Sequence, residues 1–363
     1  MPNLYTQITN IMKKHNFSAG PSILPDSVIK QAAEAVLNFN NLDLSLIEIS
    51  HRSADFTAVI NKAKELVLDI ANLSPDEYDV LFQHGGASTQ FIMTAYNLLP
   101  KDGKAGFIDT GTWSSKAIKE TKIFGEVAVL ASSKEQGYKS IPKNVSIPSA
   151  LDYLHITSNN TIYGTQYKTY PETNMPLVAD MSSDIFSKKL DFSKFDLIYA
   201  GAQKNIGASG TTLVIVKKSL IGQSGRTIPS MMNYQVQSDK GSMFNTPAVF
   251  SIYVSMLYLQ WLKDLGGLEA IEKMNEAKAK LLYDEIDRNP NFVGYADKAD
   301  RSLMNVTFNL TDAGKKERFD QLAKDAGIHA INGHRSVGGY RASIYNAMPI
   351  ESVQVLVDVM KAL

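Results

Sequence analysis

Two residues with reactive side chains, an aspartate and a lysine, stand close behind short apolar runs, 24 residues apart. Asp180 ends the run PLVAD (176–180), and Lys204 comes shortly after the run DLIYA (196–200). Both runs have the length and continuous apolar character of strands covered on both faces. Because the carboxyl ends of parallel strands meet at one edge of a sheet, we expect the carboxylate and the amine to lie together there.

An amine beside an acid at this edge fits the chemistry of pyridoxal phosphate. A lysine forms the Schiff base with this cofactor, and an acid pairs with the ring nitrogen so that the ring stays an electron sink. Taken alone, Lys204 is more simply a solvated loop lysine and Asp180 a strand-end cap. Their joint position after neighbouring strands is what favours the catalytic interpretation.

Two further segments suit the same cofactor. LFQHGGASTQF (81–91) passes from a strand through two glycines into a helix, and backbone N–H groups at a helix start bind phosphate. Ser88 and Thr89 add hydroxyl donors, and Trp113 follows another strand, where its indole would stack on the ring. Each signal alone is also consistent with an ordinary turn or with core packing.

Two loops each contain a His-Arg pair. The first, ISHRSADF (49–56), holds His51 and Arg52; the second, INGHRSVGGYRAS (331–343), holds His334 and Arg335, followed by Arg341. Arginine binds carboxylate and phosphate through two parallel hydrogen bonds, and histidine adds a donor. Solvated loop charges are the alternative for either loop alone. Together they indicate a substrate with more than one anionic group.

The elements that must position these residues alternate along the chain, which predicts an α/β fold with a mainly parallel mixed sheet flanked by helices. Helical patterns cover 88–99 and 114–125. The predicted strands are 78–82, 105–109, 127–131, 153–157, 176–180, 196–200 and 212–216.

The pattern changes after residue 248, where two long helices (248–265 and 267–287) precede a small α+β region. This region holds strands at 304–310 and 341–346 and helices at 315–328 and 351–363. We therefore expect a large domain, 16–265, a small C-terminal α+β domain, 266–363, and an extension, 1–15, that packs near the small domain.

Composition excludes several classes of function. The 363 residues carry 37 basic and 37 acidic side chains, so neither nucleic acid nor an anionic membrane is an expected partner. The chain has no cysteine, which excludes disulfides and cysteine nucleophiles. No signal peptide, membrane span, standard nucleotide-binding loop or metal motif is found, so we expect a soluble intracellular protein that holds no metal.

From Asn16 onwards the sequence closely resembles the phosphoserine aminotransferases, which are fold-type I, class V enzymes that use pyridoxal phosphate. The resemblance lies in the segments NFSAGPSILP, EISHRS, FQHGGASTQF, VADMSSDIFS, IYAGAQKNIGASG, GSMFNTP and GHRSVGGYRASIYNAMP. It implies the PLP-dependent transferase fold and a homodimer with shared active sites.

Residue roles follow from the resemblance position by position. Lys204 would form the Schiff base and act as general base, Asp180 would pair with the ring nitrogen, and Thr161 would bind the phenolic oxygen. The other residues implied to bind the cofactor are Trp113 on the ring, Ala87, Ser88, Ser182 and Gln203 on the phosphate, and Asn245 and Thr246 from the neighbouring subunit. Those implied to bind substrate are Arg341 on the α-carboxylate, and His334 and Arg335 with the other subunit's His51 and Arg52 on the phosphate.

The implied reaction interconverts O-phospho-L-serine and 2-oxoglutarate with 3-phosphohydroxypyruvate and L-glutamate in cytoplasmic serine biosynthesis. It would proceed by a ping-pong course through a Lys204 aldimine. A phosphorylated hydroxythreonine of vitamin B6 biosynthesis is a second implied substrate. Ser88 departs from some relatives, which have arginine there, so the phosphate clamp would rely more on the His-Arg pairs. The alternative is a class V aminotransferase of the alanine–glyoxylate type, acting on small unphosphorylated amino acids.

Overall fold

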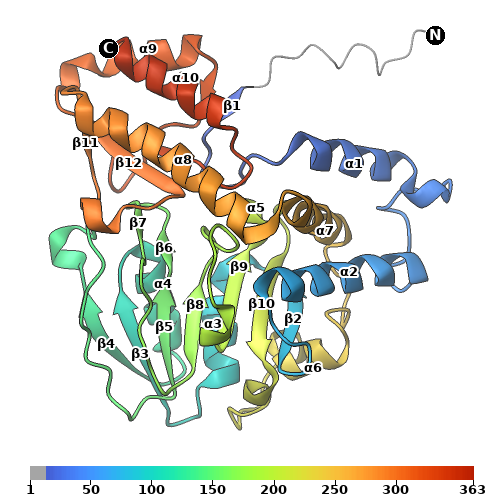
Figure 1. Ribbon diagram of the computed structural model, residues 1–363. Helices are drawn as coiled ribbons and strands as arrows, with labels where there is room; N and C mark the ends of the chain where they lie inside the picture. Colours follow the sequence, from blue (N-terminus) through green and yellow to red (C-terminus); the bar gives the residue numbers. More distant parts are fainter. Residues whose placement is uncertain (1–13) are drawn as a thin grey trace.

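All seven predicted strands of the large region form one sheet in the computed structural model, which describes residues 14–363 (Figure 1). In spatial order the strands are β2 (Tyr78–Gln83), β10 (Thr212–Lys217), β9 (Leu197–Gly201), β8 (Leu177–Asp180), β5 (Tyr153–Thr157), β3 (Lys104–Asp109) and β4 (Glu126–Ser132). Neighbouring strands are parallel, except that β10 is antiparallel to both β2 and β9. The predicted mainly parallel, mixed sheet is confirmed.

Helices cover both faces of this sheet because successive strand residues point to opposite sides. Val80 of β2 belongs to one hydrophobic cluster, and its neighbour Leu81 belongs to the cluster on the opposite face. The helices of the first face are α2 (Ala54–Ala71) and α7 (Val249–Asp264); those of the second are α3 (Gly86–Leu98), α4 (Thr112–Thr121) and α6 (Tyr234–Asp239). Within residues 14–363, no helix is long and apolar enough to cross a membrane.

The edge strand β4 departs from the prediction that every strand is covered on both faces. None of its residues is fully buried, and Val129 keeps 46% of its surface exposed. Edge position alone is not the reason, because β2, the other edge strand, is buried. Helices α2 and α6 pack on β2, whereas β4 packs mainly against α4. An apolar run of strand length therefore does not show whether helices cover both faces of the strand.

The smaller C-terminal unit packs helices on a three-stranded antiparallel sheet of order β11-β12-β14. Its elements are α8 (Gly267–Arg288), β11 (Phe292–Gly294), β12 (Asn305–Leu310), α9 (Lys316–Asp325), β13 (Ile328–His329), β14 (Tyr340–Ser343) and α10 (Ile350–Lys361). The helix predicted over 315–328 ends earlier than expected, since Gly327 adopts a φ of 73° and Ile328 begins a strand. The strand predicted over 341–346 likewise ends at Ser343.

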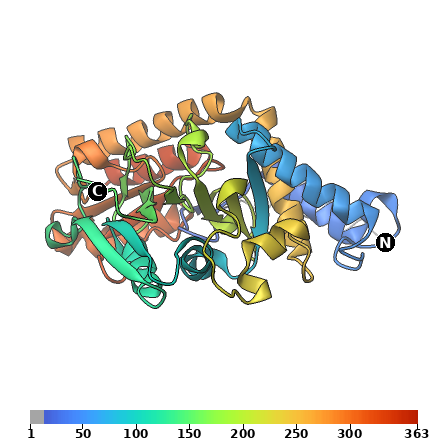
Figure 2. The ribbon, with the colours of Figure 1, turned by 90° about the horizontal axis from the view of Figure 1, so that it is seen from below.

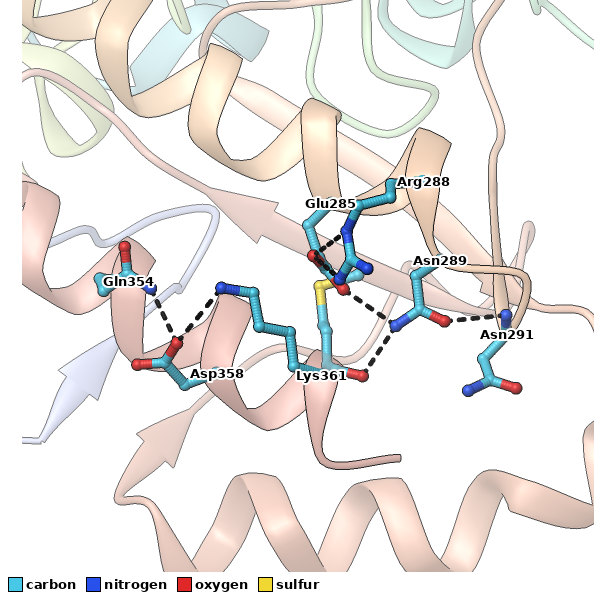
Figure 3. A network of polar contacts seen from close by, with 8 residues as sticks. Glu285, Arg288, Asn289, Asn291, Gln354, Asp358 and Lys361 are labelled. Carbon is cyan, nitrogen blue, oxygen red and sulfur yellow. Dashed lines mark hydrogen bonds and ion pairs between the residues drawn. The ribbon is translucent and has the colours of Figure 1, made fainter.

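A polar network joins the end of α8 to α10 (Figure 3). The buried Glu285 carboxylate accepts a hydrogen bond of 2.6 Å from Arg288 Nη2 and one of 2.9 Å from Asn289 Nδ2. The Asn289 amide also donates to the Met360 carbonyl at 2.9 Å. The charge of Glu285 is thus paired with a cation, and the network fixes the two helices against each other.

The N-terminal segment connects the two units. Strand β1 (His15–Asn16) pairs in parallel with β13, and Phe17 and Ile23 belong to the hydrophobic cluster of the C-terminal unit. Helix α1 (Asp26–Leu37) then lies beside α7 of the large unit. Of the extension expected over 1–15, residues 1–13 lie outside the described residues.

Candidate active site

Asp180 and Lys204 meet at the carboxyl ends of the neighbouring parallel strands β8 and β9. Asp180 is the last residue of β8, and the short helix α5 (Ala202–Asn205), which carries Lys204, follows β9 directly. Burial raises the pKa of the Asp180 carboxyl, and the Lys204 ammonium partly opposes this rise. Burial also lowers the pKa of Lys204 to about 8, against the attraction of Asp180. About a tenth of Lys204 is therefore the neutral, nucleophilic amine at pH 7, far more than for an ordinary lysine.

Thr161 and Trp113 surround the amine. The Lys204 Nζ atom donates a hydrogen bond of 2.9 Å to Thr161 Oγ1 and lies 5.4 Å from the centre of the Trp113 ring. Trp113 stands in the first turn of α4, just after β3. Four side chains predicted from separate parts of the sequence thus converge on one place at the edge of the sheet.

The N-terminal segment holds the backbone that carries Lys204. The Ser22 N–H donates to the Gln203 carbonyl at 2.9 Å, and the Ser22 hydroxyl donates to the Lys204 carbonyl. A Cβ atom on Gly20 would lie only 3.1 Å from Lys204 Cγ. The sequence analysis did not assign Ser22, although it lies within NFSAGPSILP, one of the segments that carry the family resemblance.

The start of α3 provides a cradle of backbone N–H groups. Its N-cap, Gly85, has a φ of 89°, and a Cβ atom there would lie 1.9 Å from Thr89 Oγ1, so glycine is required. Ala87 and Ser88 occupy the first turn, whose N–H groups have no acceptor within the helix. These free N–H groups and the helix dipole favour a phosphate.

Ser182 and Gln203 lie on the segments that follow β8 and β9. The buried Ser182 hydroxyl accepts a hydrogen bond of 3.2 Å from the Gly201 N–H, which links the two segments. The Ser182 side chain is also hydrogen-bonded to the Asp180 carboxyl. The side chain of Gln203, directly before Lys204, is partly exposed.

Arg341 lies on the other side of Lys204, in β14 of the C-terminal unit. Its Nη1 atom donates to the Thr161 carbonyl at 3.3 Å, whereas its Nε atom is buried and has no partner among the described residues. Burial lowers the pKa of Arg341, with only a small opposing effect from Tyr345. No ion pair joins Arg341 to a carboxylate within residues 14–363. Such an arginine suits an incoming anion.

His334 and Arg335 extend the positive region beside Arg341. Burial lowers the pKa of His334, and the charges of Arg341, Arg335 and Lys116 lower it further. The loop that holds them needs glycine at 339, where φ is 60° and a Cβ atom would lie 1.8 Å from Asn309 Oδ1. The structure therefore brings all three basic residues of the 331–343 segment to one side of the site.

Lys116 belongs to this positive region and was missed in the sequence analysis. Its Nζ atom lies 4.6 Å from the centre of the Trp113 ring, and its charge acts on His334. The spacing from Trp113, three residues on the same helix, places both on one face of α4 and was the available signal.

Asn245 and Thr246 lie in the segment before α7. The Thr246 carbonyl accepts a hydrogen bond of 3.1 Å from His84 Nε2, in the turn that leads into α3. No contact within residues 14–363 joins the side chain of either residue to Lys204 or to the start of α3.

His51 and Arg52 are not brought to the site of their own chain. They precede α2, and the turn between α1 and α2 lies at the end of the molecule remote from β8 and α5 in both views (Figures 1 and 2). The His51 Nε2 atom is buried without a partner among the described residues, and Arg52 is exposed.

The residues around Lys204 fit pyridoxal phosphate. The Trp113 Nε1 and Arg341 Nε atoms are buried donors with no partner in the described part of the chain. Asp180 is a buried carboxylate that accepts a hydrogen bond of 3.0 Å from the Ser182 N–H and is also bonded by the Ser182 side chain. A flat, cationic ring with a phosphate at one end and an aldehyde facing a neutral lysine would satisfy these groups.

Comparison with known proteins agrees with this geometry. The aminotransferase class-V family matches residues 14–356. A phosphoserine aminotransferase of Flavobacterium johnsoniae is 61% identical over 352 residues, which cover 97% of this chain and 99% of the relative.

Solved structures of similar proteins lead to the same family. Phosphoserine aminotransferase from Bacillus circulans subsp. alkalophilus is 42% identical with a TM-score of 0.94, over 97% of this chain and 98% of that one. A phosphoserine aminotransferase studied for radiation damage of its Schiff base is 48% identical with a TM-score of 0.94, over 97% and 99% of the two chains. The resemblance found in the sequence is confirmed, and the chain belongs to the phosphoserine aminotransferase family of the class V aminotransferases.

Proposed function

We propose that this protein is a pyridoxal-phosphate-dependent aminotransferase that interconverts O-phospho-L-serine and 2-oxoglutarate with 3-phosphohydroxypyruvate and L-glutamate, in serine biosynthesis. The observation that carries the proposal is the position of Arg341. This half-buried arginine has no carboxylate partner in the described residues, and its charge acts both on the Lys204 amine and on His334. Two separate anionic groups on one small amino acid would satisfy this arrangement.

Bound pyridoxal phosphate supplies the electron sink that weakens the bond between a substrate's α-carbon and its proton. Asp180 would hold a proton on the ring nitrogen, because a buried carboxylate favours a positive ring beside it. The neutral Nζ atom of Lys204 would take the proton from the substrate's α-carbon. The resulting ammonium would then give this proton to the C4′ carbon of the cofactor. Trp113 would cover the ring and exclude water, and Thr161 would hold the phenolic oxygen.

The phosphate of the cofactor would lie on the first turn of α3, with donors from Ala87, Ser88, Ser182 and Gln203. Arg341 would bind the α-carboxylate of each substrate. His334 and Arg335 would bind the phosphate of phosphoserine. Because Ser88 carries no charge, the affinity for that phosphate depends on these basic residues and on those of a second subunit.

A homodimer would supply the missing contacts. His51 and Arg52 lie away from their own site, and the segment before them exposes large apolar side chains: Leu37 at 63%, Leu44 at 49% and Ile47 at 64%. Clustered exposed apolar residues mark a surface that a partner covers. We propose that a second copy covers it, brings His51 and Arg52 to the phosphate of the substrate and places Asn245 and Thr246 at the phosphate of the cofactor. We assign the enzyme to the cytoplasm.

Two related activities fit the site to different degrees. A phosphorylated hydroxythreonine carries the same anionic groups as phosphoserine and would fit the same clamp. An alanine–glyoxylate type activity is less consistent with the site, since a small substrate without phosphate would leave the Arg335 guanidinium and the His334 ring without an anionic partner.

The test is a comparison of amino donors with 2-oxoglutarate as acceptor, on the wild type and on Arg335→Ala. We expect the wild type to prefer phosphoserine over serine. Removal of the guanidinium should lower kcat/KM for phosphoserine about tenfold to a hundredfold, as expected for one charge-assisted contact. It should change kcat/KM for 2-oxoglutarate less, because that substrate has no phosphate.

The matched control is Arg318→Ala, which removes an exposed arginine of α9 whose one hydrogen bond within residues 14–363 is to the Ala362 carbonyl. It should leave both substrates unaffected. Equal use of serine and phosphoserine by the wild type would refute the phosphate clamp. Equal losses for both substrates in Arg335→Ala would show that Arg335 has another partner.

A further inference from the structure

Four buried polar residues lie together behind the active site, where the large unit meets the C-terminal unit. We call Asn205, Asn275, Lys278 and Asn346 the polar knot; their exposed fractions are 0%, 0%, 1% and 1%. Asn205 ends α5, Asn275 and Lys278 lie on α8, and Asn346 follows β14. None of them touches the cofactor residues directly in the contacts described above, so the mechanism leaves them without a role.

Lys278 is the charged member of the knot. Its Nζ atom donates to three successive main-chain carbonyls, of Ile344 at 3.1 Å, Tyr345 at 2.7 Å and Asn346 at 3.4 Å. No carboxylate forms an ion pair with it within residues 14–363. The ammonium therefore uses all three of its donors to hold one short stretch of backbone.

The three asparagines continue this link into the large unit. The Asn346 N–H donates to Asn205 Oδ1 at 3.0 Å, and Asn275 Nδ2 donates to Asn346 Oδ1 at 2.8 Å. The side-chain amides of Asn205, Asn346 and Asn275 also donate to three successive carbonyls, those of Ile185, Phe186 and Ser187 in that order, at 2.7, 2.9 and 2.8 Å.

The positions of these contacts in the chain relate the knot to the site. Asn205 directly follows Lys204, the 185–187 stretch closely follows Asp180 and Ser182, and the 344–346 stretch closely follows Arg341. Within a few residues of Lys204, of Asp180 and of Arg341, the chain thus takes part in the same hydrogen-bonded cluster. A displacement of one part would have to break bonds to the others.

We propose that Lys278 is a positioning residue for the α-carboxylate of the substrate. By holding the carbonyls that follow Arg341, and through the contacts of Asn346 with Asn205, it fixes the Arg341 guanidinium relative to the Lys204 amine. Since Arg341 receives the carboxylate in the proposed function, this inference rests on that function.

Packing alone does not explain a lysine at this place. A methionine would fill the same volume without the cost of burying an ammonium, and a buried charge is expensive unless it is well bonded. The nearby Glu285 shows the usual solution, because Arg288 pairs with it. Lys278 has no such partner, and its Nζ atom contacts only main-chain carbonyls of the 344–346 stretch among the described residues.

The test replaces Lys278 with methionine and measures substrate use and hydrogen exchange in the holoenzyme. We expect KM for both 2-oxoglutarate and phosphoserine to rise about tenfold with kcat changed less than about threefold, because α-carboxylate binding is lost equally from ground and transition states. Amide exchange over residues 341–346 should accelerate about tenfold or more, since this stretch loses its fixed position. The exchange measurement needs no substrate, so it separates this inference from the proposed function.

The matched control is Lys280→Met on the same helix, which removes an exposed lysine whose partner is Asp284 at 2.5 Å. It should change neither KM nor exchange. Lys278→Gln keeps a shorter, uncharged donor and should give an intermediate KM, and it carries the test if the methionine variant does not fold. Unchanged KM values and unchanged exchange at 341–346, or a fall in kcat with KM unaltered, would overturn the inference.

Discussion

The region around Lys204 and the region around Lys278 each hold a lysine whose pKa is far below its ordinary value. Burial lowers the pKa of Lys204 to about 8 and that of Lys278 to about 7. The difference lies in the partners. Lys204 has one hydrogen-bond acceptor, Thr161, and faces an aromatic ring and a carboxylate, whereas all three donors of Lys278 are occupied by carbonyls.

This difference separates a lysine that reacts from one that holds structure. A depressed pKa follows from burial in both cases and does not identify the reactive one. Accessibility identifies the reactive lysine. Lys204 is partly exposed and its amine can leave Thr161, whereas Lys278 is 1% exposed and all its donors are bonded to carbonyls. Removal of the first should abolish turnover, and removal of the second should alter geometry.

The largest expected effect is that of Lys204→Ala. It removes both the covalent attachment of the cofactor and the group that moves the α-proton, so kcat should fall at least about a thousandfold. Steady-state transamination of phosphoserine measures this loss, to be compared with a nearly unchanged kcat in Lys278→Met. Turnover by Lys204→Ala within about tenfold of the wild type would break the distinction between the two lysines.

The next effect concerns stability. Because the folded pKa of Lys278 is about 7 and its ordinary value 10.5, the unfolded chain binds more protons between these values. The contribution of this group to the free energy of unfolding therefore rises with pH through this window. The stability difference between wild type and Lys278→Met should grow by about 2 kcal/mol in favour of the wild type from pH 7 to pH 9.

Denaturant unfolding at the two pH values measures that change, at equal protein concentration because the protein is expected to be a dimer. Methionine does not titrate, and the other titratable groups are the same in both proteins. Their contributions therefore cancel in the difference in unfolding free energy between wild type and Lys278→Met. The same difference at pH 7 and pH 9 would mean that Lys278 keeps its proton throughout.

The smallest effect concerns the reactivity of Lys204 in the cofactor-free enzyme. With a pKa of about 8, roughly a tenth of the amine is neutral at pH 7 and about nine-tenths at pH 9. The initial rate of pyridoxal phosphate capture, followed by its absorbance, should rise about tenfold between these values. Lys278→Met should show the same profile, and a free lysine derivative should still be rising above pH 9. An initial rate of capture that does not change between pH 7 and pH 9 would contradict a pKa of about 8 for Lys204.

The sequence was sufficient for the sheet and for most of the candidate site. Asp180 and Lys204 could be placed because each stands just after an apolar run that reads as a strand. Trp113 and the start of α3 likewise follow strands. Arg341 stood out as part of a basic loop, but its role and that of Thr161 were assigned only through the family resemblance. The contact of Arg341 with the Thr161 carbonyl, which joins the two units, was not predicted.

The polar knot was not predicted, for a physical reason. In the segment GLEAIEKMNEAKAKLLYDEID, Lys278 reads as one of many solvent-facing charges of an amphipathic helix. Its spacing nevertheless places it on the buried stripe, seven residues after Ile271 and four before Leu282, both of which are buried. The available signal in the sequence was a charged residue at an apolar position of the helical period. The three carbonyls that face Lys278 in the structure explain why a lysine is buried there.

The pairing of β1 with β13 has a consequence for how the enzyme is made. The segment that clamps the backbone of Lys204 through Ser22 is anchored at one end by His15 and Asn16, whose strand partners are Ile328 and His329. During synthesis these early residues leave the ribosome long before their partners exist. The large sheet can form as it emerges. The clamp on the reactive lysine can close only after nearly the whole chain has been translated, so an incomplete chain cannot acquire a finished catalytic site.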